Sequence, residues 1–469
     1  MAGPKHYCGV VGIVADYDVA PDVYTALMII QHRGQESAGI SVFNGASIET
    51  EKGNGLVDVA LNKESLQELT GHSAVGHVRY STTGSKSLVN AQPLTVTTNF
   101  GPVAVAHNGD ITNFSKLKDK YMKEGWTFLT DSDSELVIKL LGKYMNQYND
   151  PVKALRGTMG ELDGSYALTI LVGGRLFAVR DPYGIRPLCL GKIDGGYIAV
   201  SESAAIDALQ GELVRDIEPG EICEITKDTF KIYPAPGHHP KAHCMFEWVY
   251  FSRPDSILDG REVYSVRKRI GEILARECPA EVDLVMPVPD SGRAHAIGYA
   301  MASGIPYEEG FMKNRFAGRT FIMPDQKARE NAVSMKMIPI KSTVNGKRIM
   351  IIDDSIVRGT TLKKLVTMLR NAGAKEVHVR VGSPPIIAPC YYGVDMKTRD
   401  QFIATKHSVD EIREIIGADS LGYISIPGLV EAIGFKENDL CLACVNGKYP
   451  TNIDGEIHRF QTTLTQNNQ

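Results

Sequence analysis

Residues 348–361 read RIMIIDDSIVRGTT and decide the fold of the second half of the chain. An apolar run typical of a buried strand ends in the acids Asp353 and Asp354, and a loop with a glycine and hydroxyls follows. A helix is predicted to begin near Thr360, where unpaired backbone N–H groups and the helix dipole favour a phosphate. The acids cannot face that phosphate and suit ribose hydroxyls or a metal-bound sugar. The stretch therefore predicts a site for a phosphorylated ribose.

Predicted strands and helices alternate on both sides of this stretch. The helices are expected at 263–277, 292–303 and 360–373, and the strands at 283–289, 348–353 and 376–383. This order is typical of a parallel sheet with helices on both faces. The second half is therefore predicted to be an α/β domain.

Two further loops carry groups that suit an anionic substrate. The loop PVPDSGR at 287–293 ends a strand, and Ser291 with the backbone amides there can meet a pyrophosphate and its Mg²⁺. The loop KNRFAGRTFI at 313–322 places Lys313 and Arg315 beside a glycine. We expect this basic loop to close over the substrate, although it is equally compatible with a solvated basic turn.

The first half of the chain has a different pattern. Short β-branched runs separated by glycines extend from Cys8 to about residue 232, interrupted by predicted helices near 21–31 and 132–148. The segment YPAPGHHPKAH at 233–243 then has the composition of a linker. An α+β domain is therefore predicted to precede the α/β domain.

Cys8 opens the first predicted strand, in the run CGVVGI. Taken alone, a cysteine in such a run is more often buried in the core than reactive. If it became the first residue of a mature chain, its freed α-amine, with a pKa of about 8, could accept the thiol proton. The leader 1–7 would then be a propeptide that must be removed.

Other polar residues of the first half suit an acyl-transfer site. Arg79 ends a predicted strand and offers a planar fork to a carboxylate. Asn108 and Gly109 end another strand, where a side-chain amide and a backbone N–H can form an oxyanion hole. Asp133 suits a substrate ammonium, and the SDSE context favours it over Asp131.

The motifs of both halves resemble known families. The segments CGVVGI, QHRGQESAG, GHVRYST, HNGD and SDSE resemble, in this order, the glutamine amidotransferase domain of the N-terminal nucleophile class. That resemblance implies an αββα sandwich with Cys8 as nucleophile and Arg33 as active-site support. It also implies glutamine binding by Arg79 and Asp133, and an oxyanion hole formed by Asn108 and Gly109.

The stretch 348–361 resembles the phosphoribosyl pyrophosphate (PRPP) signature of type I phosphoribosyltransferases. The resemblance implies that Asp353 and Asp354 hold the ribose and, with Ser291, Mg²⁺, while Lys313 and Arg315 contact PRPP. The residues implied to cradle the 5′-phosphate are Ser355, Ile356, Val357, Arg358, Gly359, Thr360 and Thr361.

Together the halves resemble the glutamine PRPP amidotransferase family, whose members form 5-phosphoribosylamine, glutamate and pyrophosphate at the start of purine synthesis. The resemblance implies inhibition by purine nucleotides, a homotetramer and a closed passage for ammonia. The predicted division of the chain is a propeptide at 1–7, a glutaminase domain at 8–232, a linker at 233–262, a phosphoribosyltransferase domain at 263–420 and a C-terminal segment at 421–469.

Four of the eight cysteines match a cluster-binding branch of that family. They are Cys244, Cys390, Cys441 and Cys444. The branch implies a [4Fe–4S] cluster that ties the C-terminal segment to the linker. Spacing alone leaves Zn²⁺ open, since four thiolates bind either group.

Composition narrows the other possibilities. A formal net charge of −4 shows no basic excess and argues against a nucleic-acid partner. The chain has no apolar run of membrane length, and 1–7 lacks the apolar core of a signal peptide, so a cytoplasmic location is expected. Two alternatives remain: another ammonia-transferring synthase of the same glutaminase class, or a non-catalytic PRPP or nucleotide sensor with a redox metal site.

Overall fold

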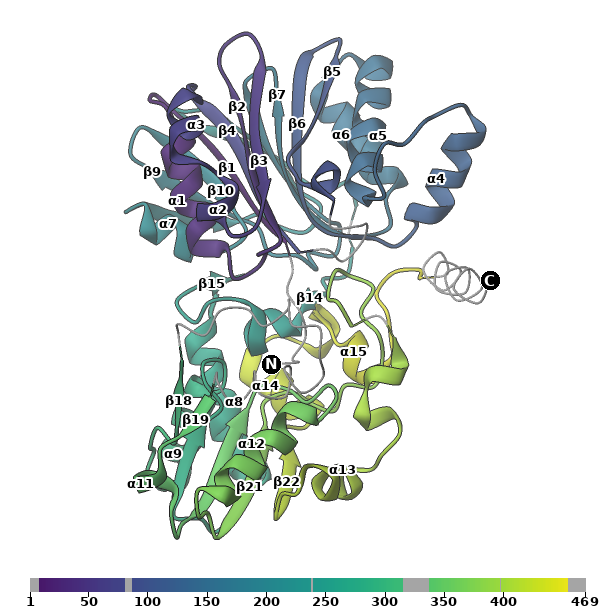
Figure 1. The fold of residues 1–469 in the computed structure, drawn as a ribbon. Helices are drawn as coiled ribbons and strands as arrows, with labels where there is room; N and C mark the ends of the chain where they lie inside the picture. Colours follow the sequence, from purple (N-terminus) through teal and green to yellow (C-terminus); the bar gives the residue numbers. More distant parts are fainter. Residues whose placement is uncertain (1–7, 81–86, 238, 315–336, 397, 454–469) are drawn as a thin grey trace.

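The computed structural model describes residues 8–80, 87–237, 239–314, 337–396 and 398–453 (Figure 1). The predicted propeptide 1–7 and Arg315, with most of the predicted closing loop, lie outside these ranges. Two bodies follow one another along the chain, with the first half above the second in Figure 1.

The first half is a sandwich of two antiparallel sheets. The seven-stranded sheet has the order β11-β9-β10-β1-β4-β2-β3, and the six-stranded sheet has the order β13-β12-β8-β7-β6-β5. The strands are β1 Gly9–Ala15, β2 Ser37–Phe43, β3 Ile48–Asn54, β4 Ser73–Arg79, β5 Leu94–Thr98, β6 Gly101–Ile111, β7 Gly164–Val172, β8 Arg175–Arg180, β9 Cys189–Ile193, β10 Gly196–Val200, β11 Glu212–Asp216, β12 Ile222–Ile225 and β13 Phe230–Tyr233.

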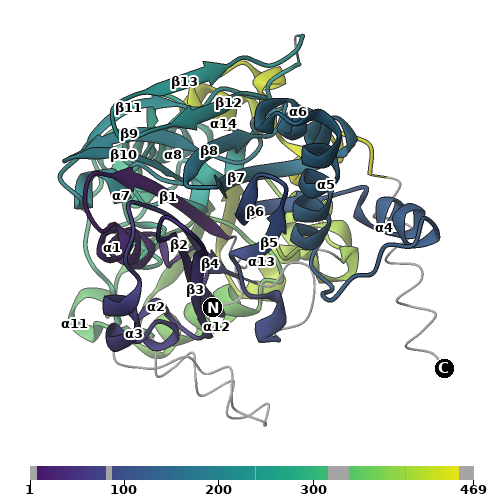
Figure 2. The same ribbon diagram turned by 90° about the horizontal axis from the view of Figure 1, so that it is seen from above.

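Helices cover the outer face of each sheet, and the sheets bury small and branched side chains between them. The helices are α1 Ala20–Ile30, α2 Val57–Ala60, α3 Lys63–Glu68, α4 Phe114–Lys123, α5 Asp133–Tyr148, α6 Pro151–Glu161 and α7 Ala204–Ala208, with a short 3₁₀ turn, η1, at Leu88–Asn90. Residues such as Val10, Ala104 and Ala167 form the core between the sheets. Figure 2 shows α1 and α5 on opposite sides of the strands, which is the predicted αββα arrangement.

The sequence pattern missed several helices of this half. Only the segments near 21–31 and 132–148 were expected to be helical, whereas α4 and α6 flank the second of them. α6 has a clear start signal, because Asp150 accepts hydrogen bonds from the backbone N–H groups of Val152 and Lys153, and Pro151 is the first helical residue.

The second half is built on a parallel sheet of order β17-β20-β21-β22. Its strands are β17 Leu284–Pro287, β20 Arg348–Asp353, β21 Glu376–Val381 and β22 Ser420–Tyr423, and its main helices are α8 Val263–Glu277, α9 Arg293–Ser303, α12 Thr360–Asn371, α13 Val409–Ile416 and α14 Ile426–Ile433. The predicted alternation of strands and helices is confirmed. β22 begins at residue 420, the predicted end of this domain, and continues to Tyr423.

Short elements lie in the connection between the halves, within the second half and in the C-terminal segment. They are β14 His243–Cys244, the π-helical turn η2 Glu247–Phe251, β15 Ile257–Leu258, β16 Arg261–Glu262, β18 Phe311–Lys313, β19 Met337–Pro339, α11 Lys341–Val344, the 3₁₀ turns η4 Arg399–Gln401, η5 Ile403–Thr405 and η6 Glu437–Asp439, β23 Leu440–Cys441 and α15 Ala443–Asn446. β14 pairs in parallel with β23, so the C-terminal segment returns to the start of the connection between the halves.

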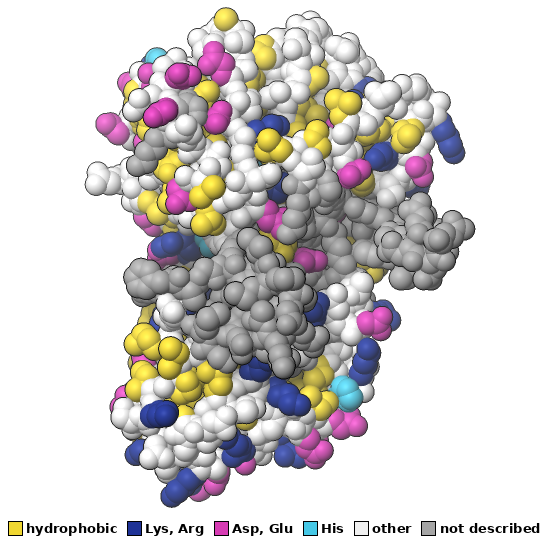
Figure 3. All heavy atoms as spheres, viewed as in Figure 1, with side chains coloured by type: hydrophobic (Ala, Val, Ile, Leu, Met, Phe, Trp, Pro, Cys, Tyr) yellow, Lys and Arg dark blue, Asp and Glu magenta, His cyan; other side chains and the backbone are white. Residues whose placement is uncertain are grey.

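The surface carries charges of both signs. Figure 3 shows acidic and basic side chains interspersed among the described residues of the lower half. No helix in the described ranges is long and apolar enough to cross a membrane.

Candidate active sites and four-cysteine centre

Cys8 lies at the start of β1, a central strand of the seven-stranded sheet. It is 8% exposed, and burial raises the pKa of its thiol to about 11, against the opposing charges of Arg79 and Arg186. While peptide-bonded to Tyr7, this thiol is therefore mostly protonated near neutral pH and needs a base. The nearby charge of Asp133 raises the pKa of the thiol further.

The predicted oxyanion pair lies on β6. Asn108 is fully buried, and neither atom of its amide has a hydrogen-bond partner among the residues that the structure describes. An unsatisfied buried amide is costly, so this group is prepared for a ligand. Gly109 is required by close approach, because a Cβ there would lie 1.9 Å from the Ser165 carbonyl oxygen.

The predicted glutamine-binding residues lie beside this pair. Arg79 ends β4 and is 3% exposed. Asp133 is buried at the start of α5, and its Oδ2 accepts a hydrogen bond from the Ile111 backbone N–H at 3.0 Å. Asp131, the competing acid, is exposed. Arg79 and Asp133 thus lie close enough to Cys8 for their charges to act on its thiol, and Asp133 contacts β6, the strand that carries the predicted oxyanion pair.

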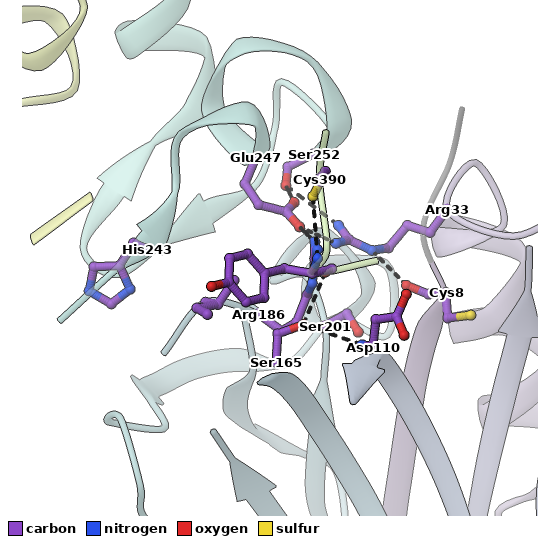
Figure 4. Close-up of polar contacts among 12 residues, drawn as sticks. Cys8, Arg33, Asp110, Ser165, Arg186, Ser201, His243, Glu247, Ser252 and Cys390 are labelled. Atoms are coloured by element: carbon purple, nitrogen blue, oxygen red, sulfur yellow. Dashed lines mark hydrogen bonds and ion pairs between the residues drawn. The ribbon is translucent and has the colours of Figure 1, made fainter. Parts of the chain in front are cut away.

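Arg33 joins this site to the connection between the halves. Its Nε donates to the Cys8 carbonyl oxygen at 3.2 Å, and its Nη2 lies 2.6 Å from Glu247 on η2 (Figure 4). Nη1 pairs with Glu202, a fully buried residue that follows β10. Burial of the guanidinium is therefore balanced by two carboxylates, which fixes its position under Cys8.

The phosphoribosyl half presents its acids at the carboxyl end of β20. Asp353 and Asp354 are 8% and 5% exposed. Burial and the adjacent Asp354 carboxylate raise the pKa of Asp353. Burial also raises the pKa of Asp354, although the hydroxyls of Ser291 and Ser355 donate to it and oppose the shift. Two crowded acids of this kind suit a cation or polyol hydroxyls.

The predicted phosphate loop separates these acids from α12. Gly359 has φ of 74° and precedes Thr360, the first residue of the helix, so its left-handed conformation turns the backbone into the helix start. Ile356 and Val357 are buried, whereas Arg358 is exposed and its Nη2 donates to Gln401. α12 therefore begins at Thr360, where the sequence predicts a helix start, and a helix N-terminus of this kind can bind a phosphate.

The second predicted loop is in contact with the first. Ser291 donates a hydrogen bond to Asp354, which joins the loop after β17 to the end of β20. Lys313, the last residue of β18, pairs with Asp290. The structure therefore places Lys313 beside the Ser291 loop, while Arg315 lies outside the described residues.

The four cysteines predicted to bind a metal centre form a buried group. Cys244 on β14 is in register with Cys441 on β23, and the Ile387 and Ala388 backbone N–H groups donate to the Cys444 carbonyl oxygen at 2.9 Å and 3.1 Å. Each of the four residues is 7–8% exposed. Besides burial, the charge of neighbouring thiols of the group raises the pKa of Cys444.

The chemistry of these four side chains limits the groups that they could hold. Within the described ranges, no set of three His, Cys, Asp or Glu side chains is placed to hold a metal ion. Four buried thiols are chemically suited to a soft, thiolate-bound group, and four thiolates bind either a cluster or Zn²⁺.

Known proteins resemble both halves and the whole chain. A family model described as a glutamine amidotransferase domain matches residues 77–208, and one described as a phosphoribosyl transferase domain matches residues 255–381. Amidophosphoribosyltransferases of Methanothermobacter thermautotrophicus and Archaeoglobus fulgidus are 49% and 50% identical, covering 97% and 96% of this chain and 96% and 99% of theirs. The chain belongs to the amidophosphoribosyltransferase family.

A solved amidophosphoribosyltransferase shares the fold. The Bacillus subtilis glutamine PRPP amidotransferase, complexed with ADP and GMP, superposes with a TM-score of 0.90 at 42% identity. The match covers 95% of this chain and 98% of that one. The predicted fold class, a glutamine amidotransferase domain followed by a phosphoribosyltransferase domain, is confirmed.

Several buried residues between the site at Cys8 and the acids at the end of β20 were not predicted from the sequence. Glu202 and Glu247 hold Arg33, and Arg267 of α8 donates to the Trp248 and Ser252 carbonyl oxygens. Burial lowers the pKa of Arg267 to about 10, and the charge of Asp354 partly opposes this shift. Arg186 is the fourth such residue. No local signal marks these four residues, because their partners come from distant segments.

Proposed function

We infer that this chain transfers ammonia from glutamine to PRPP, with water, to give 5-phosphoribosylamine, glutamate and pyrophosphate, the first step of purine biosynthesis. The observation that carries this inference is the presence on one chain of an acyl-transfer site at Cys8 and a helix-terminal ribose phosphate site at Asp353. Neither centre alone would consume both substrates.

In the proposed glutaminase reaction, Cys8 Sγ attacks the glutamine carboxamide carbon. The Asn108 amide and the Gly109 backbone N–H stabilise the developing oxyanion, while Arg79 and Asp133 hold the substrate carboxylate and ammonium. Ammonia leaves as a glutamyl thioester forms, and water then releases glutamate. The base is the α-amine of Cys8, so the proposal requires cleavage between Tyr7 and Cys8.

In the proposed synthase reaction, the loop from Ser355 to Thr361 binds the 5′-phosphate and the two acids hold the ribose. Asp353, Asp354 and Ser291 would hold Mg²⁺, which supplies charge neutralisation for the departing pyrophosphate. The raised pKa values of the two acids fit this role, since a cation between them relieves their repulsion. Ammonia attacks C1 of the ribose from a passage closed to bulk water.

We also propose that Cys244, Cys390, Cys441 and Cys444 hold a [4Fe–4S] cluster. The group would fasten the C-terminal segment to β14 by thiolate bonds. The burial of all four residues supports a buried thiolate-bound group, and iron and sulfide analysis distinguishes the cluster from Zn²⁺.

Purine nucleotides are the proposed regulators, and a homotetramer in the cytoplasm is the proposed state. The support for nucleotide binding is the related B. subtilis enzyme, which was solved with ADP and GMP. Nucleotide phosphates suit the same helix N-terminus that binds the PRPP phosphate, so competition with PRPP is expected.

The test is glutamate release from glutamine with and without PRPP, followed together with pyrophosphate release. Stoichiometric release of both products, dependent on PRPP, supports the proposal. Hydrolysis of glutamine that PRPP does not affect favours another synthase of the same class, and no hydrolysis under any condition favours a sensor. Intact mass with iron and sulfide analysis checks the start at Cys8 and the cluster, and a Met1 start with zinc contradicts both.

A further inference from the structure

The segment Cys390–Gly393 contacts two centres that the proposed mechanism treats separately. At one end, the Tyr392 backbone N–H approaches Cys390 Sγ at 3.4 Å. At the other, the Ser165 hydroxyl donates to the Tyr392 carbonyl oxygen at 3.0 Å and accepts from the Asp110 backbone N–H at 3.3 Å. Asp110 directly follows Gly109, so one hydroxyl joins the cysteine-bearing segment to the oxyanion strand.

Gly393 makes the second connection. A Cβ on this residue would lie 3.2 Å from Arg186 Nη2 and 3.4 Å from the carbonyl carbon and oxygen of Gly109. Its φ of 102° also favours glycine. The Arg186 guanidinium and the Gly109 peptide therefore both lie against the side of Gly393 on which a Cβ would stand.

Arg186 is fully buried in the segment between β8 and β9. Its Nη1 lies 3.4 Å from Glu247 Oε1, an oxygen that also accepts from Arg33 at 2.6 Å. Figure 4 shows Arg186 between Glu247 and Cys390 on one side and Ser165 on the other. One carboxylate, that of Glu247, therefore contacts both buried arginines.

Those neighbours are thiols of both centres. Arg186 is close enough to Cys8, Cys390 and Cys441 for its charge to act on each of them. Thiolates on a metal centre add negative charge in a region with little water, where a nearby fixed cation stabilises them most.

We propose that Arg186 is a positioning residue shared by the glutaminase site and the four-cysteine centre. It holds Gly393 against the Gly109 peptide and offsets the charge of the thiolate centre. A change in the charge of that centre therefore alters the position of the oxyanion-hole peptide and leaves PRPP binding unchanged. The inference rests on the proposed function. It adds Arg186 as a positioning residue and a coupling between the four-cysteine centre and the glutaminase site.

The experiment compares Arg186→Met and Arg186→Lys in the full-length holoenzyme. For Arg186→Met we expect a fall of about 10–100-fold in glutaminase kcat, typical for loss of an outer partner of a metal site, with ammonia-dependent synthesis retained. The reduction potential of the cluster should shift to a more negative value, because loss of a cation disfavours the added electron. Arg186→Lys should recover part of both changes.

Arg380→Met is the matched control, since Arg380 is a buried arginine of β21 that donates to the Cys278 and Pro279 carbonyl oxygens. A parallel fall of glutamine- and ammonia-dependent activity in Arg186→Met overturns the proposal, as does an unchanged reduction potential. Ser165→Ala removes the hydroxyl that binds the segment Cys390–Gly393 without removing a buried charge. Glutaminase activity of this variant equal to that of wild type also overturns the proposal. Failure of the proposed function is seen separately, as absence of PRPP-dependent glutamate release in the wild-type enzyme.

Discussion

The two catalytic centres prepare for their substrates in opposite ways. The glutaminase half buries a neutral amide, Asn108, without a partner in the described residues, and cations such as Arg79 and Arg186 act on the nearby Cys8 thiol. The phosphoribosyl half buries two adjacent acids whose pKa values are raised. The first centre is complementary to a developing anion, and the second to a cation and sugar hydroxyls.

Cys8→Ala should produce the largest separation between the halves. Loss of the nucleophile should lower glutamine-dependent synthesis on the order of 10³-fold or more, because no other group forms the thioester. Synthesis from ammonium salts should remain, since the acids at β20 are untouched. Pyrophosphate release with each nitrogen source measures both, and a parallel loss of both activities would contradict the independence of the two centres.

Asn108→Ala should have the next largest effect. Removal of one oxyanion donor is expected to lower glutaminase kcat by about 10²–10³-fold with little change in the KM for glutamine, since the amide acts on the transition state. Asn113→Ala serves as control, because that amide binds the Glu161 carbonyl oxygen away from the site. A raised KM at unchanged kcat would instead assign Asn108 to substrate binding.

Asp354→Asn tests the acid pair of the phosphoribosyl half. Loss of one acid should weaken PRPP-dependent synthesis about 10–100-fold with either nitrogen source, because the ribose and Mg²⁺ lose a ligand. Titration with Mg²⁺ at fixed PRPP should show a higher requirement for the ion. Asp283→Asn is a control acid of the same sheet, paired with Arg348. An Asp354→Asn effect confined to glutamine-dependent synthesis would place this residue in the coupling rather than in the site.

Acid should destabilise both halves alike, through one buried histidine in each. Burial lowers the pKa of His77 in the first half and of His295 in the second to about 3. Each folded-state pKa lies below the unfolded value of about 6.5, so stability is lost as pH falls from about 6.5 towards 3, by up to about 1.4 kcal/mol per pH unit per histidine.

Thermal unfolding of wild type, His77→Gln and His295→Gln between pH 7 and pH 4.5 measures this small effect. Each variant should have a shallower pH dependence than wild type. A slope that only one of the two substitutions reduces would show that the halves respond to acid differently.

The parts of the fold that could be predicted are those whose sequence signals lie within a few neighbouring residues. In the second half, each strand end and helix start lies within a few residues of its motif, so 348–361 located β20, the acid pair and α12. In the first half, α4 and α6 were missed because long strand-rich text surrounds them, although the Asp150–Pro151 start of α6 was visible. The cysteine group was predicted from resemblance, since its members come from segments nearly 150 and 50 residues apart.

The sequence by itself determined which reactive residues the chain carries and in which order. They are a cysteine before a strand, an amide–glycine pair at the end of another strand, a double acid before a helix, and four further cysteines. Short-range signals suffice for these features, because strand ends and helix caps are decided within a few residues. Only the tertiary structure decided that Arg33, Glu247 and Arg186 lie between the centres and that Gly393 lies against Gly109. Those contacts depend on strand register and on the packing of segments far apart along the chain, and no local pattern encodes either.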